Sequence, residues 1–154
     1  MISVWRIVKQ EYAGIAFTGD GTVLFSGRWN NPGIKVVYAA ASLSLAALEN
    51  LVHLQSEGGG IKFVSFKVAI PAWVKISEVS AGQIPKDWRA CPASESTRLI
   101  GTKWAKKNGT LLLRVPSVVI PSEFDYLINP LHRDFASLKI SAPEPFSFDQ
   151  RLWK

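Results

Sequence analysis

The sequence predicts an α+β fold, in which a single domain of residues 1–154 has a central mixed or antiparallel sheet and a few helices. Three observations predict this class. About six to eight short runs of apolar, β-branched or aromatic residues are separated by Gly, Pro and Asn, as is typical of short strands. Only two segments have the length and apolar spacing of main helices. Strands and helices do not alternate regularly, which argues against a doubly wound parallel sheet.

The first predicted strand covers residues 2–8. These residues alternate and are rich in β-branched and aromatic side chains. Arg6 shares a face with Val4 and Val8 on such a strand, and a cation on an apolar face requires an acidic partner or a ligand. The alternative is an edge strand on which Arg6 faces water.

A loop, a strand and a helix are predicted to follow. Residues 12–25 contain several glycines and an Asp-Gly pair, which predicts a loop or a short hairpin. Residues 35–40 are a short apolar run and predict a buried strand. Ser42 is a suitable N-cap for a helix over residues 43–55. That helix is apolar on most of its circumference, so we expect it to be buried on nearly all sides.

The second half of the chain supplies the other predicted strands and the second helix. This helix covers residues 94–107, with an inner stripe of Leu99, Ile100 and Trp104 and with lysines in its last turn, where positive charge suits the helix dipole. Gly58 to Gly60 predict a flexible joint. The further strands are expected at residues 61–70, 74–79, 111–120, 126–128, 137–140 and 146–153.

Charge and composition restrict the class of protein. The net charge of +6 and the isoelectric point of about 9.6 suit an anionic partner: a nucleotide, a nucleic acid or an acidic protein. The charges are dispersed, so a mildly basic surface is the alternative. Cys91 is the only cysteine, and no spacing typical of a metal site occurs. A signal-like segment and a long apolar run are both missing, so we expect a cytoplasmic protein without a membrane span.

Three polar residues stand where packing alone would not put them. Arg28 lies in a turn rich in Gly and Asn, and its forked side chain suits phosphate; the alternative is a surface turn with Trp29 packed below. Tyr38 ends a predicted buried strand and either belongs to the core or stacks on a heterocycle. Glu49 lies mid-helix among apolar residues. It either occupies a solvent-facing stripe or points into a cleft, because burying an unpartnered carboxylate is costly.

Together these residue types predict cleavage of a glycosidic bond. The cation would hold a diphosphate or pair with the carboxylate, and the ring would stack on a base. The carboxylate would stabilise positive charge that develops on a sugar. A P-loop and a dinucleotide-binding glycine motif are missing from the sequence. Ser117, His132 and Asp134 could form a hydrolase triad, but no Gly-x-Ser-x-Gly motif supports one.

Short motifs over nearly the whole chain resemble the RES-domain family, which comprises toxins of bacterial toxin–antitoxin pairs and is named for an Arg, a Glu and a Ser. The motifs keep the family's order and are specific only in combination. They are Trp5-Arg6, Gly27-Arg28-Trp29-Asn30, Val36-Val37-Tyr38, Leu48-Glu49, Val52-His53, Pro116-Ser117 and Asn129-Pro130-Leu131-His132. The sequence departs from the family pattern at Ser26, at Asp125-Tyr126 and at Arg133.

The resemblance implies a fold similar to the ADP-ribosyltransferase toxins and an attack on NAD. NAD would be a substrate and no cofactor would be required. The nicotinamide–ribose bond would be cleaved by hydrolysis or phosphorolysis. Three residues would be catalytic. Arg28 would hold NAD, Tyr38 would pack on the nicotinamide or ribose, and Glu49 would orient a ribose hydroxyl and stabilise the cationic transition state.

The resemblance also implies binding residues and a partner. The substrate-binding set would be Arg6, Trp29, Asn30 and Ser117, without a metal. The partner would be an Xre-type antitoxin that covers the active site and makes any DNA contact itself; a homodimer is left open. Two other functions stay open, namely ADP-ribosylation of a specific protein and, least favoured, a basic nucleic-acid-binding module.

Overall fold

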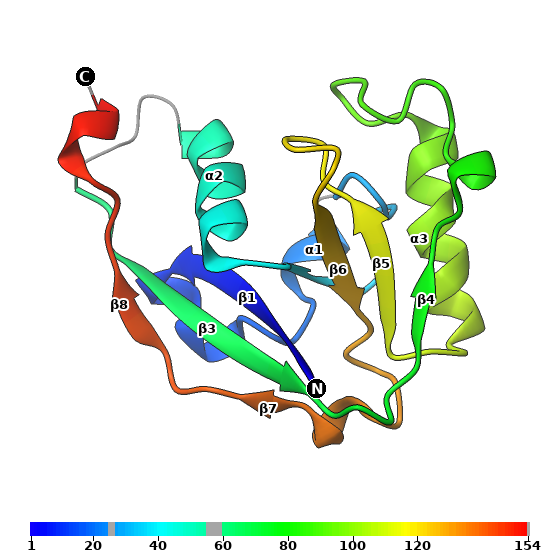
Figure 1. Cartoon of the computed structure of the whole chain (residues 1–154), viewed down its shortest axis with the longest axis horizontal. Coiled ribbons are helices and arrows are strands. Elements are labelled where there is room, and N and C mark those ends of the chain that lie inside the picture. Colours follow the sequence, from blue (N-terminus) through cyan, green and yellow to red (C-terminus); the bar gives the residue numbers. More distant parts are fainter. Residues whose placement is uncertain (25–26, 55–59, 154) are drawn as a thin grey trace.

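One curled, mixed sheet organises the molecule. Within residues 1–24, 27–54 and 60–153, which the computed structural model describes, the strands are β1 (Ile2–Lys9), β2 (Val37–Ala40), β3 (Phe63–Ile70), β4 (Ile76–Glu78), β5 (Leu112–Pro116), β6 (Phe124–Ile128), β7 (Lys139–Ile140) and β8 (Glu144–Phe146). Their order is β4-β5-β6-β2-β1-β3-β7, and β8 also pairs with β3. β4 and β5 are parallel and the other pairs are antiparallel. The predicted α+β class is confirmed (Figure 1).

β1 lies inside the sheet and not at its edge. It pairs with β3 along its whole length, and it pairs with β2 where Trp5 lies opposite Ala40. Val4 and Ile7 on this strand are buried. Because strands border β1 on both sides, the edge-strand interpretation of Arg6 is wrong.

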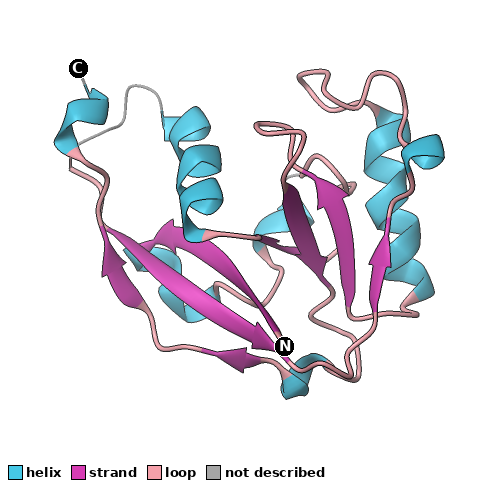
Figure 2. Ribbon diagram, viewed as in Figure 1, coloured by secondary structure: helices cyan, strands magenta, loops and turns pink. Residues whose placement is uncertain are grey.

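Two main helices stand over different halves of the sheet (Figure 2). α2 (Leu43–Leu54) packs on β1 and β2 through buried Leu45 and Ala46. α3 (Glu95–Lys107) belongs to the cluster that contains residues of β5 and β6. Ser94 caps α3 by accepting a hydrogen bond from the Thr97 amide, and Asn108 ends the helix in the left-handed conformation at φ 54°.

The prediction that the first main helix is buried on nearly all sides is wrong. On α2, the Leu48 side chain is 37% exposed and Val52 is 49% exposed. The sheet covers only one side of α2, and a cavity borders another. Of the predicted inner stripe of α3, Ile100 and Trp104 pack against the cluster that contains residues of β5 and β6. The fully buried positions of the helix are Thr97, Gly101 and Thr102.

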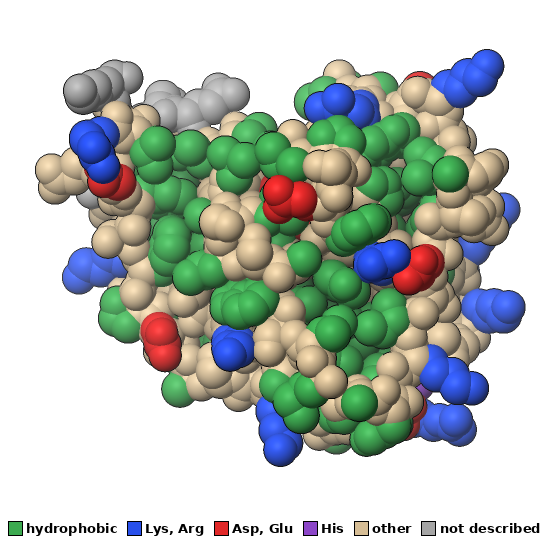
Figure 3. Space-filling view, viewed as in Figure 1, with side chains coloured by type: hydrophobic (Ala, Val, Ile, Leu, Met, Phe, Trp, Pro, Cys, Tyr) green, Lys and Arg blue, Asp and Glu red, His purple; other side chains and the backbone are tan. Residues whose placement is uncertain are grey.

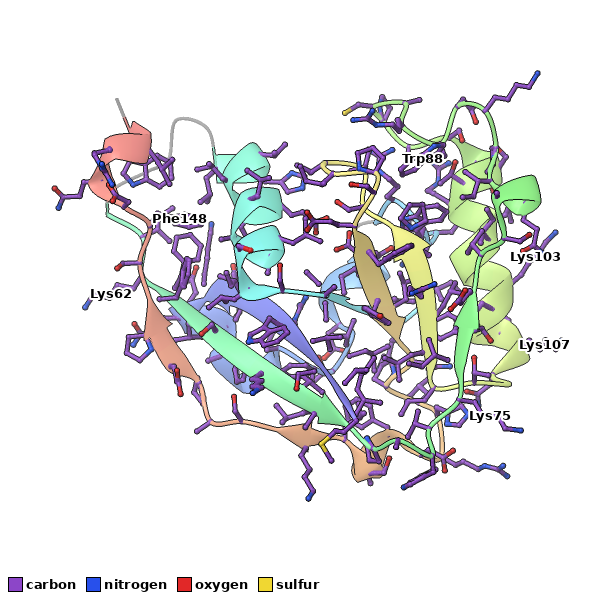
Figure 4. The ribbon with its side chains drawn as sticks, in the orientation of Figure 1. Lys62, Lys75, Trp88, Lys103, Lys107 and Phe148 are labelled. Atoms are coloured by element: carbon purple, nitrogen blue, oxygen red, sulfur yellow. The ribbon has the colours of Figure 1, made fainter. Side chains whose placement is uncertain are left out.

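Short helices occupy several places where loops or strands were expected. η1 (Gln10–Ile15) overlaps the predicted loop or short hairpin of residues 12–25, and α1 (Gly21–Leu24) lies within it. Residue 25 is outside the described residues, as are Gln55 of the predicted helix and Gly58 and Gly59 of the predicted joint. The last strand is β8, and η4 (Gln150–Trp153) follows it. Between them, Phe148 makes edge-to-face contacts with Phe146 and Trp153, and Figure 4 shows Phe148 beside β8. The remaining 3₁₀ segments are η2 (Ala81–Gln83) and η3 (Phe135–Ser137).

Positive charge lies mainly at the margins of the face that Figure 3 shows, while hydrophobic side chains cover much of its centre. Lys103 and Lys107 point outward from α3, and Lys62 and Lys75 lie near the edges of the molecule (Figure 4). On this face, the described side chains do not form a continuous basic groove of the kind that tracks a nucleic-acid backbone. Among the helices that the structure describes, none combines the length and the apolarity needed to cross a membrane.

Candidate active site

A cavity of about 900 Å³ lies beside α2, within the size range of small-molecule sites. Its walls come from β1, β2, β6 and α2, from Arg98 of α3, and from segments 27–29, 89–93 and 118–119. Five predicted site residues line it, namely Arg6, Arg28, Trp29, Tyr38 and Glu49. The other two predicted residues, Asn30 and Ser117, are fully buried behind the wall.

Glu49 is held on the wall of this cavity by Ser117. The Ser117 hydroxyl donates a hydrogen bond of 2.7 Å to Glu49 Oε1. The Ser117 oxygen also accepts hydrogen bonds from the amides of Val119 and Ile120, each at 3.2 Å. These local bonds turn the chain directly after β5, so the prediction that the strand continues through residues 117–120 is wrong. Because Glu49 faces the cavity and accepts this bond, the solvent-stripe interpretation of Glu49 is also wrong.

Asp125 is a second carboxyl group in the same wall. It lies on β6, is only 8% exposed, and lines the same cavity as Glu49. Burial and the neighbouring Glu49 carboxyl group raise the pKa of Asp125 well above its usual range. From the sequence, Asp125 stood out only as a departure from a family pattern. A signal was available, because Asp125 interrupts the apolar run of residues 124–128.

Tyr38 is anchored through its hydroxyl group. The hydroxyl donates a 2.5 Å hydrogen bond to Asn30 Oδ1 and accepts one of 3.1 Å from the Trp29 amide. Burial is the largest of the influences that raise the pKa of Tyr38. A β-carbon at Gly27 would collide with the Tyr38 hydroxyl, so the turn approaches the ring as closely as a glycine permits. Because its hydroxyl group is hydrogen-bonded to Asn30 and Trp29, Tyr38 presents its ring to the cavity.

Asn30 holds the turn together from behind. Its Oδ1 accepts a hydrogen bond from the Gly27 amide as well as from Tyr38, and its Nδ2 donates to the carbonyls of Asn31 and Ile34. The side chain is therefore fully used, and Asn30 does not line the cavity. The structure gives Asn30 a supporting position next to Tyr38.

Arg6 is satisfied by backbone groups. Its Nε donates to the Ala16 carbonyl at 2.8 Å, and its Nη1 donates to the Tyr38 carbonyl at 2.9 Å. Among the described residues Arg6 has no acidic partner of the kind that the sequence predicted. Burial lowers the pKa of Arg6 to about 10, so the guanidinium is charged at neutral pH. Nη2 makes no hydrogen bond within the described residues and is available at the cavity wall.

Arg28 and Arg89 add positive charge at two further walls. Nη1 of Arg28 donates to the carbonyls of Trp88 and Ala90, at 2.9 and 2.7 Å. Trp88 also stacks on Trp29, with ring centroids 6.0 Å apart, and Figure 4 shows it near the start of α3. Arg89 donates to the Val118 carbonyl at 2.9 Å. Arg89 was not predicted as a site residue, because this loop carries no motif.

The cavity has a carboxylate on one wall and arginine side chains on several others. A carboxylate in a partly enclosed site can stabilise positive charge that develops on a substrate. Arginine side chains with free N–H groups can bind phosphate or carboxylate oxygens. In the part of the chain that the structure describes, no group of three His, Cys, Asp or Glu residues could hold a metal ion. The chemistry that these residues support is therefore electrostatic stabilisation of a cationic centre within an anionic ligand.

Comparisons with known proteins identify a family and several similar proteins. Residues 3–149 match the RES domain family. The chain is 38% identical over 150 residues to Toxin Res of Yersinia enterocolitica, covering 97% of this chain and 98% of that protein. It is 38% identical over 154 residues to the Prs ADP-ribosylating toxin of a Sphingobium species, with coverages of 97% and 96%. The M. tuberculosis MbcT–MbcA toxin–antitoxin complex contains a chain with the same fold, at a TM-score of 0.75 and 13% identity over 95% of this chain and 84% of that one.

Proposed function

Because this chain belongs to the RES domain family, we propose that it is the toxin of a toxin–antitoxin pair and that it consumes NAD by cleaving the nicotinamide–ribose bond. The names of its relatives support the first part, since they are called toxins. One relative is called ADP-ribosylating, and that reaction requires the same bond to break. Hydrolysis or phosphorolysis of NAD would halt growth by exhausting a central metabolite.

The observation that carries the proposal is the position of Glu49. Its carboxylate lies in the wall of the 900 Å³ cavity, fixed by Ser117 at 2.7 Å. Loss of nicotinamide leaves positive charge on the ribose, and a fixed negative charge beside that carbon lowers the barrier. In this proposal, Glu49 stabilises that charge and holds a ribose hydroxyl.

The arginines would bind the diphosphate of NAD. Arg6 offers Nη2, and Arg28 offers Nε and Nη2, because none of these atoms has a hydrogen-bond partner within the described residues. The ring of Tyr38 would pack on the nicotinamide or the ribose, and Trp29 would support it from the buried side. Arg89 joins this set, since it lines the same cavity. NAD is the substrate, and the proposal requires no other cofactor.

ADP-ribosylation of a specific protein is the second candidate, favoured by the name of the Sphingobium relative at 38% identity. The two candidates share the bond that breaks and differ in the acceptor of ADP-ribose. Water or phosphate needs little room, whereas a protein acceptor must dock at the mouth of the cavity. Product identity therefore separates them.

Product analysis with purified protein tests the proposal. NAD would be incubated with and without phosphate, and nicotinamide, ADP-ribose and its phosphate ester would be separated by chromatography. We expect nicotinamide release by the wild type and a loss of at least about 100-fold in Glu49→Gln, which keeps the shape and removes the charge. Asp149→Asn, in an exposed pair with Arg151, is the matched control. Nicotinamide release by Glu49→Gln at the wild-type rate would contradict the role of Glu49, and release only with a bacterial lysate would favour the protein acceptor.

The partner would be an Xre-type antitoxin that covers the cavity in the cytoplasm. A similar fold occurs in a toxin–antitoxin complex. The exposed Val52 side chain at the cavity wall would contact the antitoxin. Co-purification with the product of the neighbouring gene, followed by measurement of NAD cleavage by the complex, tests this part. Full NAD cleavage by a stable complex would contradict occlusion of the active site. The mass of the free protein would decide whether it forms a homodimer.

A further inference from the structure

Two carboxyl groups from different elements meet in the cavity wall. Glu49 comes from α2, and Asp125 comes from β6, where it lies opposite Ala40 of β2. Both residues line the cavity, and Asp125 is 8% exposed. Two ionised carboxylates that share one poorly solvated wall repel each other, so one of the two groups is favoured in its neutral form.

The surrounding hydrogen bonds assign the proton to Asp125. Glu49 already has a hydrogen-bond donor, the Ser117 hydroxyl group. Asp125 receives no donor from the described residues, and its Oδ1 is buried without a hydrogen-bond partner among them. An ionised carboxylate in that position would have neither a cation nor a hydrogen-bond donor to offset the free-energy cost of burying its charge. Burying a neutral carboxyl group has a much smaller free-energy cost.

We propose that Asp125 is a neutral carboxylic acid at physiological pH and that it donates a hydrogen bond to Glu49, so that Asp125 is a positioning residue for the carboxylate. Ser117 and Asp125 then hold Glu49 from two sides. The protonation state of Asp125 follows from the structure alone, and its effect on catalysis rests on the proposed NAD cleavage.

Other charged or titratable groups surround the pair, but none of those described forms an ion pair with Asp125. Those that line the cavity are Arg6 of β1, Tyr38 of β2, His53 of α2, Arg98 of α3, and Arg28, Arg89 and Cys91 of the loops. Within the described residues, none of them forms a hydrogen bond or an ion pair with Asp125. The neighbours that raise its pKa are the surrounding apolar groups and Glu49. Burial is the largest of these causes and Glu49 comes second, so replacing Glu49 provides a second test.

The first test is the pH dependence of stability, which needs no substrate. In the unfolded chain Asp125 ionises near its ordinary pKa of about 3.9. In the folded chain it keeps its proton, so folding takes up a proton and stability falls as pH rises. Asp125→Asn cannot ionise. From about pH 5 to pH 8, we expect the unfolding equilibrium constant of the wild type to grow relative to that of Asp125→Asn, by up to about tenfold per pH unit.

Controls make this result specific. Asp149→Asn removes an exposed carboxyl group, and its difference from the wild type should not grow with pH in this range. In a Glu49→Gln background the effect of Asp125→Asn should depend less on pH, because the neighbouring negative charge is gone. A difference between Asp125→Asn and wild type that stays constant from pH 5 to pH 8 would mean that Asp125 is ionised, and the proposal would be overturned.

The second test concerns positioning. An asparagine at residue 125 can still donate a hydrogen bond to Glu49, whereas an alanine cannot. We expect Asp125→Asn to keep kcat for NAD cleavage within about threefold of wild type and Asp125→Ala to lose at least about tenfold. At alkaline pH, Asp125→Asn should stay active where the wild type declines. Equal loss in both variants would overturn the positioning role.

The outcomes separate this inference from the proposed function. If the wild type does not cleave NAD, the proposed function fails, while the stability measurement still decides the proton on Asp125. If Asp125→Asn does not fold, infrared spectroscopy of the wild type can detect a protonated carboxyl group at neutral pH, with Glu49→Gln as the comparison. Absence of a protonated carboxyl band from the folded wild type would overturn the proposal.

Discussion

The hydroxyl group of Ser117 donates a 2.7 Å hydrogen bond to Glu49 Oε1 across 68 residues of sequence. Because the Ser117 oxygen also accepts two backbone amides from the following turn, its proton is directed at Glu49. Ser117 follows β5, and Glu49 lies on α2. The bond therefore joins the two halves of the molecule at the cavity wall.

Replacing Ser117 by alanine tests whether this bond positions Glu49. A hydrogen bond to a charged group contributes about 1.5 to 3 kcal/mol. If that contribution is lost in the transition state, kcat for NAD cleavage falls by roughly 10- to 100-fold. Steady-state kinetics measures the loss. Because the amides of Val119 and Ile120 also lose their acceptor, urea unfolding should report a stability loss of about 1 to 3 kcal/mol.

The exposed Ser147, which lies outside the active-site cavity, is the matched control for this substitution. Ser147→Ala should leave both kcat and the urea midpoint unchanged, because an isolated surface substitution changes stability by only about 0.5 kcal/mol or less. Wild-type kcat in Ser117→Ala, together with a lowered urea midpoint, would limit Ser117 to holding the turn after β5.

Tyr38→Phe separates the ring of Tyr38 from its hydroxyl group. The substitution leaves the Trp29 amide without its acceptor, and an unsatisfied buried donor costs about 1 to 3 kcal/mol. We expect a lower thermal midpoint with little change in the KM for NAD, since the ring is what faces the cavity. Tyr12→Phe, at an exposed tyrosine, is the control. A large rise in KM with unchanged stability would show instead that the hydroxyl contacts the substrate.

The sequence predicted the elements whose signals are local. The alternating residues of β1 and the cap at Ser42 each act within a few positions, and both appear in the structure. The turn after β5 was missed because the Ser117 side chain competes with the strand for its backbone amides. The RES-domain resemblance, which depended on spaced motifs, is confirmed by the match over residues 3–149.

The site itself depended on long-range pairing. Arg28, Tyr38 and Glu49 could be named because they stand out in their own segments. Asp125 could not be placed beside Glu49, because that proximity depends on the antiparallel register between β2 and β6. Arg89 lies in a loop without a motif, and in the structure it lines the cavity and donates a hydrogen bond to the Val118 carbonyl.

Arg28→Lys tests whether this side chain both holds the loop at Trp88 and Ala90 and binds the diphosphate of NAD. Lysine keeps the positive charge but cannot bridge the carbonyls of Trp88 and Ala90 and still present a fork to phosphate. Loss of one charge-assisted hydrogen bond, about 1.5 kcal/mol, corresponds to about a tenfold rise in the KM for NAD. We expect kcat to change less than KM. The exposed Arg151 provides the control Arg151→Lys, and an unchanged KM in Arg28→Lys would mean that Arg28 only holds the loop.

Gly101→Ala tests whether the contact between α3 and the Arg28 turn maintains the site. In an ordinary helix this change stabilises by up to about 1 kcal/mol. Here the new β-carbon would collide with the Trp29 carbonyl and approach Leu127 Cδ2 to 2.9 Å. Overpacking costs about 1 to 3 kcal/mol, so urea unfolding should show net destabilisation. The KM for NAD should also rise, because the displaced backbone carries Arg28. Gly82→Ala, where no neighbour lies within 4 Å, should leave the KM unchanged and should not destabilise the protein. A stabilised Gly101→Ala protein would show that α3 can move away from the turn without cost.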